Sequence, residues 1–163
     1  MNPSPLTFTE AGFLAPAKGI EASLEAIEAF FVKAFPHSET RSRLFENYMG
    51  YLHRFQNDIF PWFEMWVDGS FVTLKENPKD IDVVTFLDWE VCKFRAGSLE
   101  KFYSYNLEKE GIDAYIVPVY PKEHIRHTEF LELQNRWKTR FTNDGNSGGS
   151  KGYLVLNFGK IIE

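Results

Sequence analysis

Cysteine is almost absent from this 163-residue chain, in which Cys92 stands alone. One thiol cannot close an intrachain disulfide, so the sequence lacks the bonding that stabilises small extracellular proteins, and we expect a cytoplasmic protein. No spacing pairs Cys92 with a histidine, as a nucleophile would require. We therefore expect Cys92 to be a small buried hydrophobic side chain.

Long apolar runs and an excess of positive charge are also missing. No stretch reaches the roughly 20 apolar residues of a membrane span, and residues 1–16 lack a basic start followed by an apolar segment. We therefore expect a soluble protein with no membrane partner. The chain carries 18 Lys and Arg against 23 Asp and Glu, a formal net charge of −5. This balance argues against a protein that coats nucleic acid through a general positive field and leaves room only for a local groove.

Aromatic residues, in contrast, are abundant. Phe, Trp and Tyr make up 17% of the chain, with 16 Phe and 4 Trp among them, and we expect most of these rings to pack in a core. The length fits a single domain. We predict that residues 1–163 form one domain with a helical part over 1–60, a core over 61–120, and a C-terminal helix and strand over 121–163.

Hydrophobic periodicity predicts alternating helices and strands after an irregular lead-in over residues 1–19. Pro36 and Pro61 break the apolar pattern, and Gly111 stands where glycine favours a helix end. The predicted fold class is α/β (α+β), a short mixed β-sheet flanked by helices. The predicted helices cover residues 20–35, 38–57, 98–109 and 122–141, the predicted strands cover 62–67, 81–87, 113–120 and 151–158, and residues 143–150 are predicted to form a mobile surface loop.

Two carboxylates in the segment Asp80-Ile81-Asp82 carry the main chemical signal. Residues two apart in a strand point the same way, so Asp80 and Asp82 can converge on a divalent cation. Mg²⁺ prefers oxygen ligands and usually takes one or two carboxylates together with substrate phosphates. Two such ions about 4 Å apart can clamp the attacking and leaving oxygens of a phosphoryl displacement.

A turn and a third acid stand near this pair. Gly69-Ser70 precedes Asp80 in the segment GSFVTLKENPKDIDVV, and Asp113 opens the next predicted strand, in IDAYIVPVYP. A Gly-Ser pair alone is simply a turn, and an Asp-x-Asp pair alone is common on solvated strand edges. Their combination with a third acid is much more specific.

With these motifs the chain resembles the polymerase-beta-like nucleotidyltransferase superfamily, whose signature is Gly-Ser, a spacer of similar length, Asp-x-Asp and a later carboxylate. It is closer to small bacterial members, the minimal nucleotidyltransferases and those of toxin–antitoxin and phage-defence systems. The resemblance covers about residues 62–120. It implies the nucleotidyltransferase fold, Mg²⁺ or Mn²⁺ as cofactor, and transfer of a nucleotide from a nucleoside triphosphate to an RNA (tRNA) or protein acceptor. A partner protein from an adjacent gene is a further expectation.

The resemblance also implies roles for single residues. Gly69 would let the backbone approach the triphosphate and Ser70 would hydrogen-bond its outer phosphates. Asp80 and Asp82 would hold the metal, and Asp113 would ligate the catalytic ion or accept the proton of the acceptor hydroxyl. Many small members carry an arginine soon after Gly-Ser. This chain offers other candidates for the phosphates: Thr73, Lys75 and Lys79, of which the lysines act as point charges.

Two other functions stay open. The first is a catalytically silent nucleotidyltransferase-like protein that binds and regulates a partner. The second is a metal-dependent nuclease with the same carboxylates, which ranks last because Val83, Val84 and Thr85 stand where a lysine usually follows.

Some further polar residues fit a solvated surface better than a site. His124 and His127 are three residues apart on a predicted helix, but no third metal ligand accompanies them. A basic group on the C-terminal helix can steer a tRNA end or an acidic partner, although a solvated helix face is the simpler interpretation. This group consists of Arg126, Arg136, Lys138 and Arg140 on the helix and of Lys151 after the predicted loop.

Overall fold

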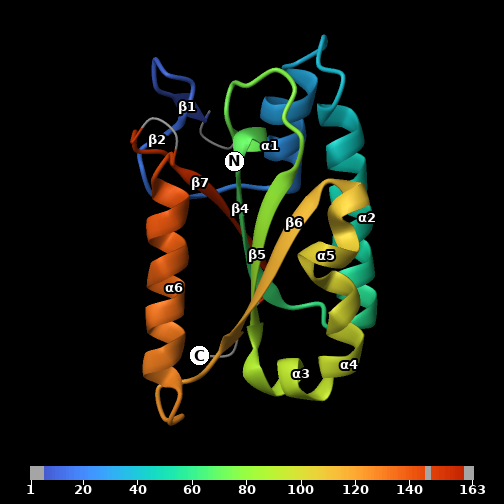
Figure 1. Ribbon diagram of the computed structural model, residues 1–163, viewed down its shortest axis with the longest axis vertical. Coiled ribbons are helices and arrows are strands. Elements are labelled where there is room, and N and C mark those ends of the chain that lie inside the picture. Colours follow the sequence, from blue (N-terminus) through green and yellow to red (C-terminus); the bar gives the residue numbers. More distant parts are fainter. Residues whose placement is uncertain (1–5, 146–147, 160–163) are drawn as a thin grey trace.

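A five-stranded mixed β-sheet with helices on both faces forms the centre of the molecule (Figure 1). The computed structural model describes residues 6–145 and 148–159. The strand order is β3-β7-β4-β5-β6, in which β3 and β7 are parallel, β5 and β6 are parallel, and β4 runs antiparallel to both of its neighbours. The strands are β3 (Gly19–Glu21), β4 (Phe63–Asp68), β5 (Ile81–Asp88), β6 (Ile112–Val119) and β7 (Tyr153–Phe158).

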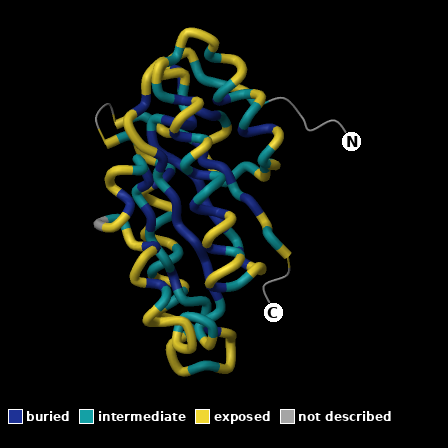
Figure 2. The backbone as a smooth tube through the Cα atoms, turned by 90° about the vertical axis from the view of Figure 1, so that its right-hand side faces the viewer, coloured by how far each residue is buried: buried dark blue, intermediate teal, exposed yellow. Residues whose placement is uncertain are grey.

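One face of the sheet packs against α2 (Arg41–Asp58) and the shorter helices, and it holds the main core. Alternate strand residues such as Met65 and Val83 meet Tyr48 and Phe55 of α2, and all four are almost fully buried. Figure 2 shows the central strands as the most continuously buried part of the chain. This arrangement follows from strand alternation, which sends every second side chain to the same face.

The opposite face of the sheet packs against α6 (His127–Thr142) through aromatic rings. Trp66, Phe86 and Tyr153 of the sheet cluster there with Phe141 of α6, and Tyr115 lies 4.7 Å from Trp137 between ring centroids. Phe141 is the only fully buried residue of α6. The helix is therefore amphipathic, with its basic residues toward solvent.

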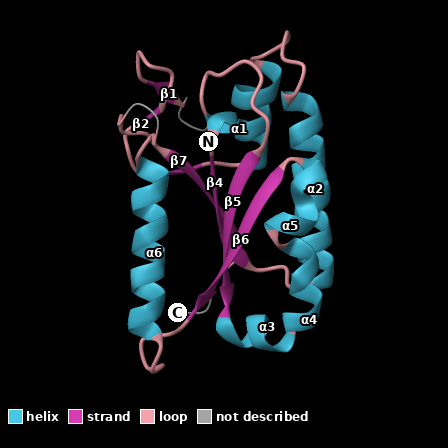
Figure 3. Ribbon diagram, in the orientation of Figure 1, coloured by secondary structure: helices cyan, strands magenta, loops and turns pink. Residues whose placement is uncertain are grey.

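Between β5 and β6 the chain forms several short helical pieces rather than one helix (Figure 3). The pieces are α3 (Trp89–Phe94), α4 (Ala96–Leu99), a 3₁₀ turn (Glu100–Phe102), α5 (Ser104–Leu107) and a second 3₁₀ turn (Glu108–Glu110). The single helix predicted over 98–109 is therefore wrong, because Tyr103 has an extended backbone and interrupts it. Gly111 has the left-handed conformation predicted for it, with φ of +73°.

The N-terminal region differs most from the prediction. A small hairpin of β1 (Thr7–Phe8) and β2 (Leu14–Ala15) precedes β3, so residues 19–21 form a strand instead of the start of a helix. The helix α1 (Leu24–Glu28) begins at Ser23, whose Oγ accepts the N–H of Ala26 and caps it. A π-helical turn (Ala29–Lys33) follows, so the helix predicted over 20–35 is replaced by a strand and two shorter pieces.

The other predicted elements are confirmed with small shifts of their ends. The helix predicted over 38–57 is α2, and the strands predicted over 62–67, 81–87, 113–120 and 151–158 are β4, β5, β6 and β7. The last helix begins at His127 rather than Lys122, since turns occupy the residues after Pro121. Within the described ranges, no helix is long and apolar enough to cross a membrane.

Candidate active site

Three aspartates lie side by side on neighbouring strands at one end of the sheet. Asp82 of β5 is the register partner of Asp68 on β4 and of Asp113 on β6. In Figure 1 this is the upper end, where β5 and β6 begin and β4 ends. Because they share a register, their side chains lie on the same sheet face, the one that α6 covers. We call Asp68, Asp82 and Asp113 the acid row.

Gly69 brings the backbone against the acid row. Its φ of +84° lies in a region that favours glycine, and a Cβ at this position would lie 2.8 Å from Asp82 Oδ2. Both the conformation and the space therefore require glycine here. A 3₁₀ turn (Ser70–Val72) follows, and Thr73 Oγ1 donates to the Ser70 carbonyl at 2.7 Å.

Asp68 is the most buried member of the acid row. It is 2% exposed, and its Oδ2 lies 2.8 Å from Nζ of Lys151, which comes just before β7. Its other oxygen, Oδ1, is buried and accepts no hydrogen bond from the described residues. Burial raises the pKa of Asp68 to about 7, although the Lys151 charge acts in the opposite direction.

Asp82 is half-buried between the other acids. Burial is the largest cause that raises its pKa to about 6, and the charges of Asp80 and Asp113 add to it. The positive charges of Lys151 and Arg140 act the other way. Like-charged carboxylates that repel one another in this way are stabilised by a cation.

Asp113 and Asp80 lie toward the open edge of the sheet. The hydroxyl of Ser104, on α5, donates to Asp113 Oδ1, and its oxygen accepts the N–H of Ala114 at 2.9 Å. Asp80 is exposed and precedes β5 by one residue, so it does not share a strand with Asp82 as the spacing predicted. The hydrogen bond from Ser104 holds the Asp113 carboxylate toward α5.

Two cavities flank the acid row. One, of about 510 Å³, lies between residues 11–13 and the turn after β4, and its polar lining is Ser70, Thr73, Lys75, Asp144 and Lys151 together with Gly69; we call it the lysine cavity. The other, of about 350 Å³, is lined by Asp80, Ser104, Glu108, Gly111 and Asp113, and we call it the edge cavity. Four of the five residues predicted to bind a nucleotide thus line one cavity. The fifth, Lys79, is exposed and is not among the residues that line it.

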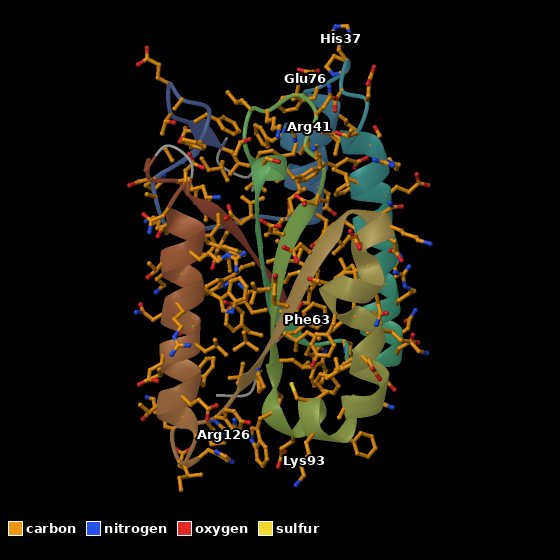
Figure 4. All side chains as sticks on the ribbon, viewed as in Figure 1. His37, Arg41, Phe63, Glu76, Lys93 and Arg126 are labelled. Atoms are coloured by element: carbon orange, nitrogen blue, oxygen red, sulfur yellow. The ribbon has the colours of Figure 1, made fainter. Side chains whose placement is uncertain are left out.

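A fully buried arginine fixes the wall of the lysine cavity. The guanidinium of Arg41 donates to the carbonyl oxygens of Phe71 at 2.6 Å and Thr73 at 2.8 Å, and also to that of Lys75. It also donates to the Phe31 carbonyl oxygen at 2.9 Å and lies 3.9 Å from the centroid of the Phe35 ring. Figure 4 shows Arg41 beneath the loop that carries Glu76. Burial lowers its pKa to about 10, so it remains a cation at neutral pH.

The carboxylate oxygens are hard donors of the kind that Mg²⁺ or Mn²⁺ binds, and the unpartnered Asp68 Oδ1 is one more such donor. However, no group of three or more His, Cys, Asp or Glu side chains in the described ranges is close enough to hold a metal ion. The side chains as they lie thus do not converge on one point. The metal and catalytic roles of Asp80, Asp82 and Asp113 stay predictions.

His124, His127 and Cys92 lie at the other end of the sheet. His124 packs 4.5 Å from Trp89 and 4.6 Å from Tyr120 between ring centroids, and His127 Nδ1 lies 2.8 Å from the Tyr120 carbonyl. These histidines therefore contact an aromatic cluster as well as solvent. Cys92 is half-buried, and burial raises the pKa of its thiol to about 12, as expected for a residue that is not a nucleophile.

Three residues that shape the site have no role in the sequence-based predictions, namely Asp68, Arg41 and Ser104. Lys151 stands in those predictions only beside the basic residues that can steer a tRNA end or an acidic partner. Asp68 directly precedes Gly69 in the chain. Its position at the end of a buried strand, next to a glycine and opposite Asp82, was a usable signal. Contacts of Lys151 and Arg41 join segments far apart in the chain and have no local pattern.

The comparisons with known proteins identify a family whose function is unknown. Residues 6–157 match a family described as "Family of unknown function (DUF6932)". This match spans most of the chain, so the protein belongs to that family. No curated protein and no solved structure matches the chain.

Proposed function

We propose that this member of the DUF6932 family is a nucleotidyltransferase dependent on Mg²⁺ or Mn²⁺, with the fold of the polymerase-beta-like superfamily. It moves a nucleotide from a nucleoside triphosphate to a hydroxyl of an RNA (tRNA) or a protein. One observation carries this proposal: the acid row lies directly against Gly69, with the lysine cavity on one side and the edge cavity on the other.

The lysine cavity suits the triphosphate of the donor. Gly69 has no side chain to block the approach, and Ser70 and Thr73 carry hydroxyls. Lys75 and Lys151 supply positive charge in a protein that is acidic overall. An ammonium group meets phosphate as a point charge, which is the form of recognition that lysine provides.

The edge cavity suits the acceptor hydroxyl, because Asp113 lines it and can accept a proton there. In the reaction the acceptor oxygen bonds to the α-phosphorus, its proton passes to Asp113, and the bond from the α-phosphorus to the bridging oxygen breaks, which releases pyrophosphate. Asp82 and Asp80 would hold the divalent cation, which supplies charge neutralisation and orientation of the phosphates.

A macromolecular acceptor fits the edge cavity better than a small one. The cavity is small, lies at an open strand edge and is bordered by exposed residues of α5 and the following turn. An acceptor hydroxyl at the end of an RNA or on a protein loop can enter such a site while the rest of the molecule stays outside. We propose a bacterial, cytoplasmic setting, in a toxin–antitoxin or phage-defence system with a partner from an adjacent gene.

A silent nucleotide-binding protein is the second candidate. It is favoured by the arrangement of the acids, since no three of them in the described ranges form a metal-binding group. Such a protein would bind a partner or nucleotide and transfer nothing.

Transfer of label separates the two candidates. The protein is incubated with each nucleoside triphosphate labelled at the α-phosphate, with Mg²⁺ or Mn²⁺ and host lysate. We expect the wild type to label an RNA or protein and Asp82→Asn to label nothing. Asp88→Asn is the matched control, because Asp88 ends the same strand and caps α3, where asparagine caps equally well. Absence of label with the wild type, despite measurable binding of a nucleotide, would favour the silent protein.

A further inference from the structure

Lys151 has an unusual position for a lysine. Its ammonium lies 2.8 Å from a carboxylate that is itself almost fully buried, and the Lys151 side chain is only 13% exposed. Exposed ion pairs hold a lysine weakly, but a pair with so little solvent around it is screened far less. The contact is therefore a built feature of the site and not a chance encounter at the surface.

The carboxylates beside Lys151 have more acceptor capacity than the lysine uses. Asp68 Oδ1 is buried and accepts no hydrogen bond within the described part of the chain, although Oδ2 is paired. Asp82, the register partner of Asp68, also feels the Lys151 charge. Two neighbouring carboxylates with an unpartnered buried oxygen form a position for a cation of higher charge than an ammonium.

We propose that Lys151 is an exchangeable internal cation: in the metal-free protein its ammonium takes the place of a divalent cation at Asp68 and Asp82, and it gives up this place when the metal binds. The inference rests on the proposed function, because it concerns the same site. It also adds Asp68 to the metal ligands, a role that the Asp-x-Asp pattern does not indicate.

The structure provides a second place for the displaced ammonium. Lys151 lines the lysine cavity together with Gly69 and Ser70, so its side chain borders both the acids and the space for the phosphates. Its flexible four-carbon chain can move the charge between these two neighbours. The ammonium can then pair with the phosphates that arrive with the metal.

Metal affinity tests the exchange directly, without any measurement of activity. Mn²⁺ is titrated calorimetrically into the nucleotide-free wild type, Lys151→Met and Lys151→Arg. Lys151→Met removes the repulsion between the ammonium and a dication placed at Asp68 and Asp82. We therefore expect this variant to bind Mn²⁺ about tenfold more tightly or better. Lys151→Arg keeps the charge and should bind as weakly as the wild type. Lys138→Met is the matched control, since it removes an exposed lysine of α6 outside the acid row.

The outcomes separate this inference from the proposed function. Equal Mn²⁺ affinity of the wild type and Lys151→Met contradicts the exchange but leaves a metal-binding transferase intact. Tighter binding by Lys151→Met that is abolished by a second change, Asp68→Asn, supports the exchange. An absence of Mn²⁺ binding to all variants, with nucleotide present as well as absent, contradicts both proposals.

A measurement on the wild type does not depend on the folding of any variant. Lysine side chains are labelled with an amine-reactive acylating reagent, and the extent of labelling at Lys151 is read by mass spectrometry. Mg²⁺ without nucleotide should raise the labelling of Lys151 severalfold, because the ammonium leaves Asp68, while labelling of Lys138 stays constant. Unchanged labelling of Lys151 at a concentration of Mg²⁺ that saturates the protein would overturn the inference.

Discussion

The lysine cavity and the edge cavity lie on either side of the same acids, but their walls are built differently. The lysine cavity is bounded by a glycine whose backbone conformation favours glycine and by a loop that Arg41 holds through several carbonyl oxygens. The edge cavity is bounded by α5 and a 3₁₀ turn, pieces of four and three residues. One wall is thus fixed by a network of hydrogen bonds and the other by short local elements.

This difference agrees with what each cavity is proposed to bind. The donor triphosphate is the same chemical group in every reaction cycle, and a preorganised wall avoids the cost of ordering the loop each time. An acceptor that is part of a larger molecule needs an opening that adapts to it, and short helical pieces are the less stable, more adaptable parts of a fold. The predictions below test whether the two sides really differ in this way.

Arg41→Met should have the largest effect on stability. The substitution leaves buried carbonyl oxygens without a donor, and each unsatisfied group is costly, so we expect a loss of more than about 3 kcal/mol in the free energy of unfolding. Chemical denaturation measures it. Arg136→Met, an exposed residue on α6, is the control and should change stability little. Equal stability of both variants would show that the lysine cavity is not fastened by Arg41.

Gly69→Ala should have the second largest effect. The new Cβ would meet Asp82 Oδ2 and would force alanine into a conformation that costs of order 1–3 kcal/mol. We expect a lower melting temperature and loss of nucleotide binding. Gly97→Ala is the matched control, because Gly97 lies on α4 with no atom near its Cβ position, and alanine should be neutral or slightly stabilising there. Normal nucleotide affinity in Gly69→Ala would contradict the close approach of the phosphates.

Ser104→Ala tests the edge cavity and should have a smaller effect. It removes the hydrogen bond to Asp113, so we expect a loss of about 1 kcal/mol in stability. Transfer should fall about tenfold in kcat with little change in KM for the nucleotide, since the base is less well oriented. Ser104→Thr keeps the hydroxyl and should restore most of the rate. A large rise in KM for the nucleotide would instead place Ser104 on the donor side.

The pH dependence of stability tests the burial of the acid row itself, between the two cavities. The pKa values of Asp68 (about 7) and Asp82 (about 6) are raised above the ordinary value for aspartate, so the folded chain binds these protons more tightly than the unfolded chain. The contribution of these groups to stability is therefore present at about pH 4 and is lost as the pH rises to about 7. In a chelator, the melting temperature should fall over this range by more in the wild type than in Asp68→Asn. Identical slopes of melting temperature against pH in the wild type and Asp68→Asn would contradict the burial of the Asp68 carboxylate.

Local patterns in the sequence were sufficient for the centre of the fold. The apolar residues around Val83 predicted β5 to within one residue, and the helical spacing of Leu44, Tyr48 and Leu52 predicted α2 to within three. Gly69-Ser70 and the later aspartates were also enough to predict which strands carry the candidate site. These features are encoded within a few residues, which is why they can be read from one sequence.

The contacts that complete the candidate site could not be predicted in this way. Lys151 meets Asp68 only because β7 returns beside β4, and Arg41 reaches the loop after β4 only because α2 packs across the sheet. The broken helix between β5 and β6 was missed because apolar spacing does not report an extended residue such as Tyr103. Tertiary packing decides all three features.

Asp113→Asn provides the most direct test of nucleotidyl transfer. The variant and the wild type are compared for nucleotide affinity in the presence of Mn²⁺ and for transfer of labelled nucleotide to the acceptor in host lysate. The account predicts that affinity changes little, because the other acids still hold the cation and the lysine cavity is intact, while kcat falls by a factor of about 100 or more. Equal transfer by both proteins, or the same absence of label from both, would contradict it.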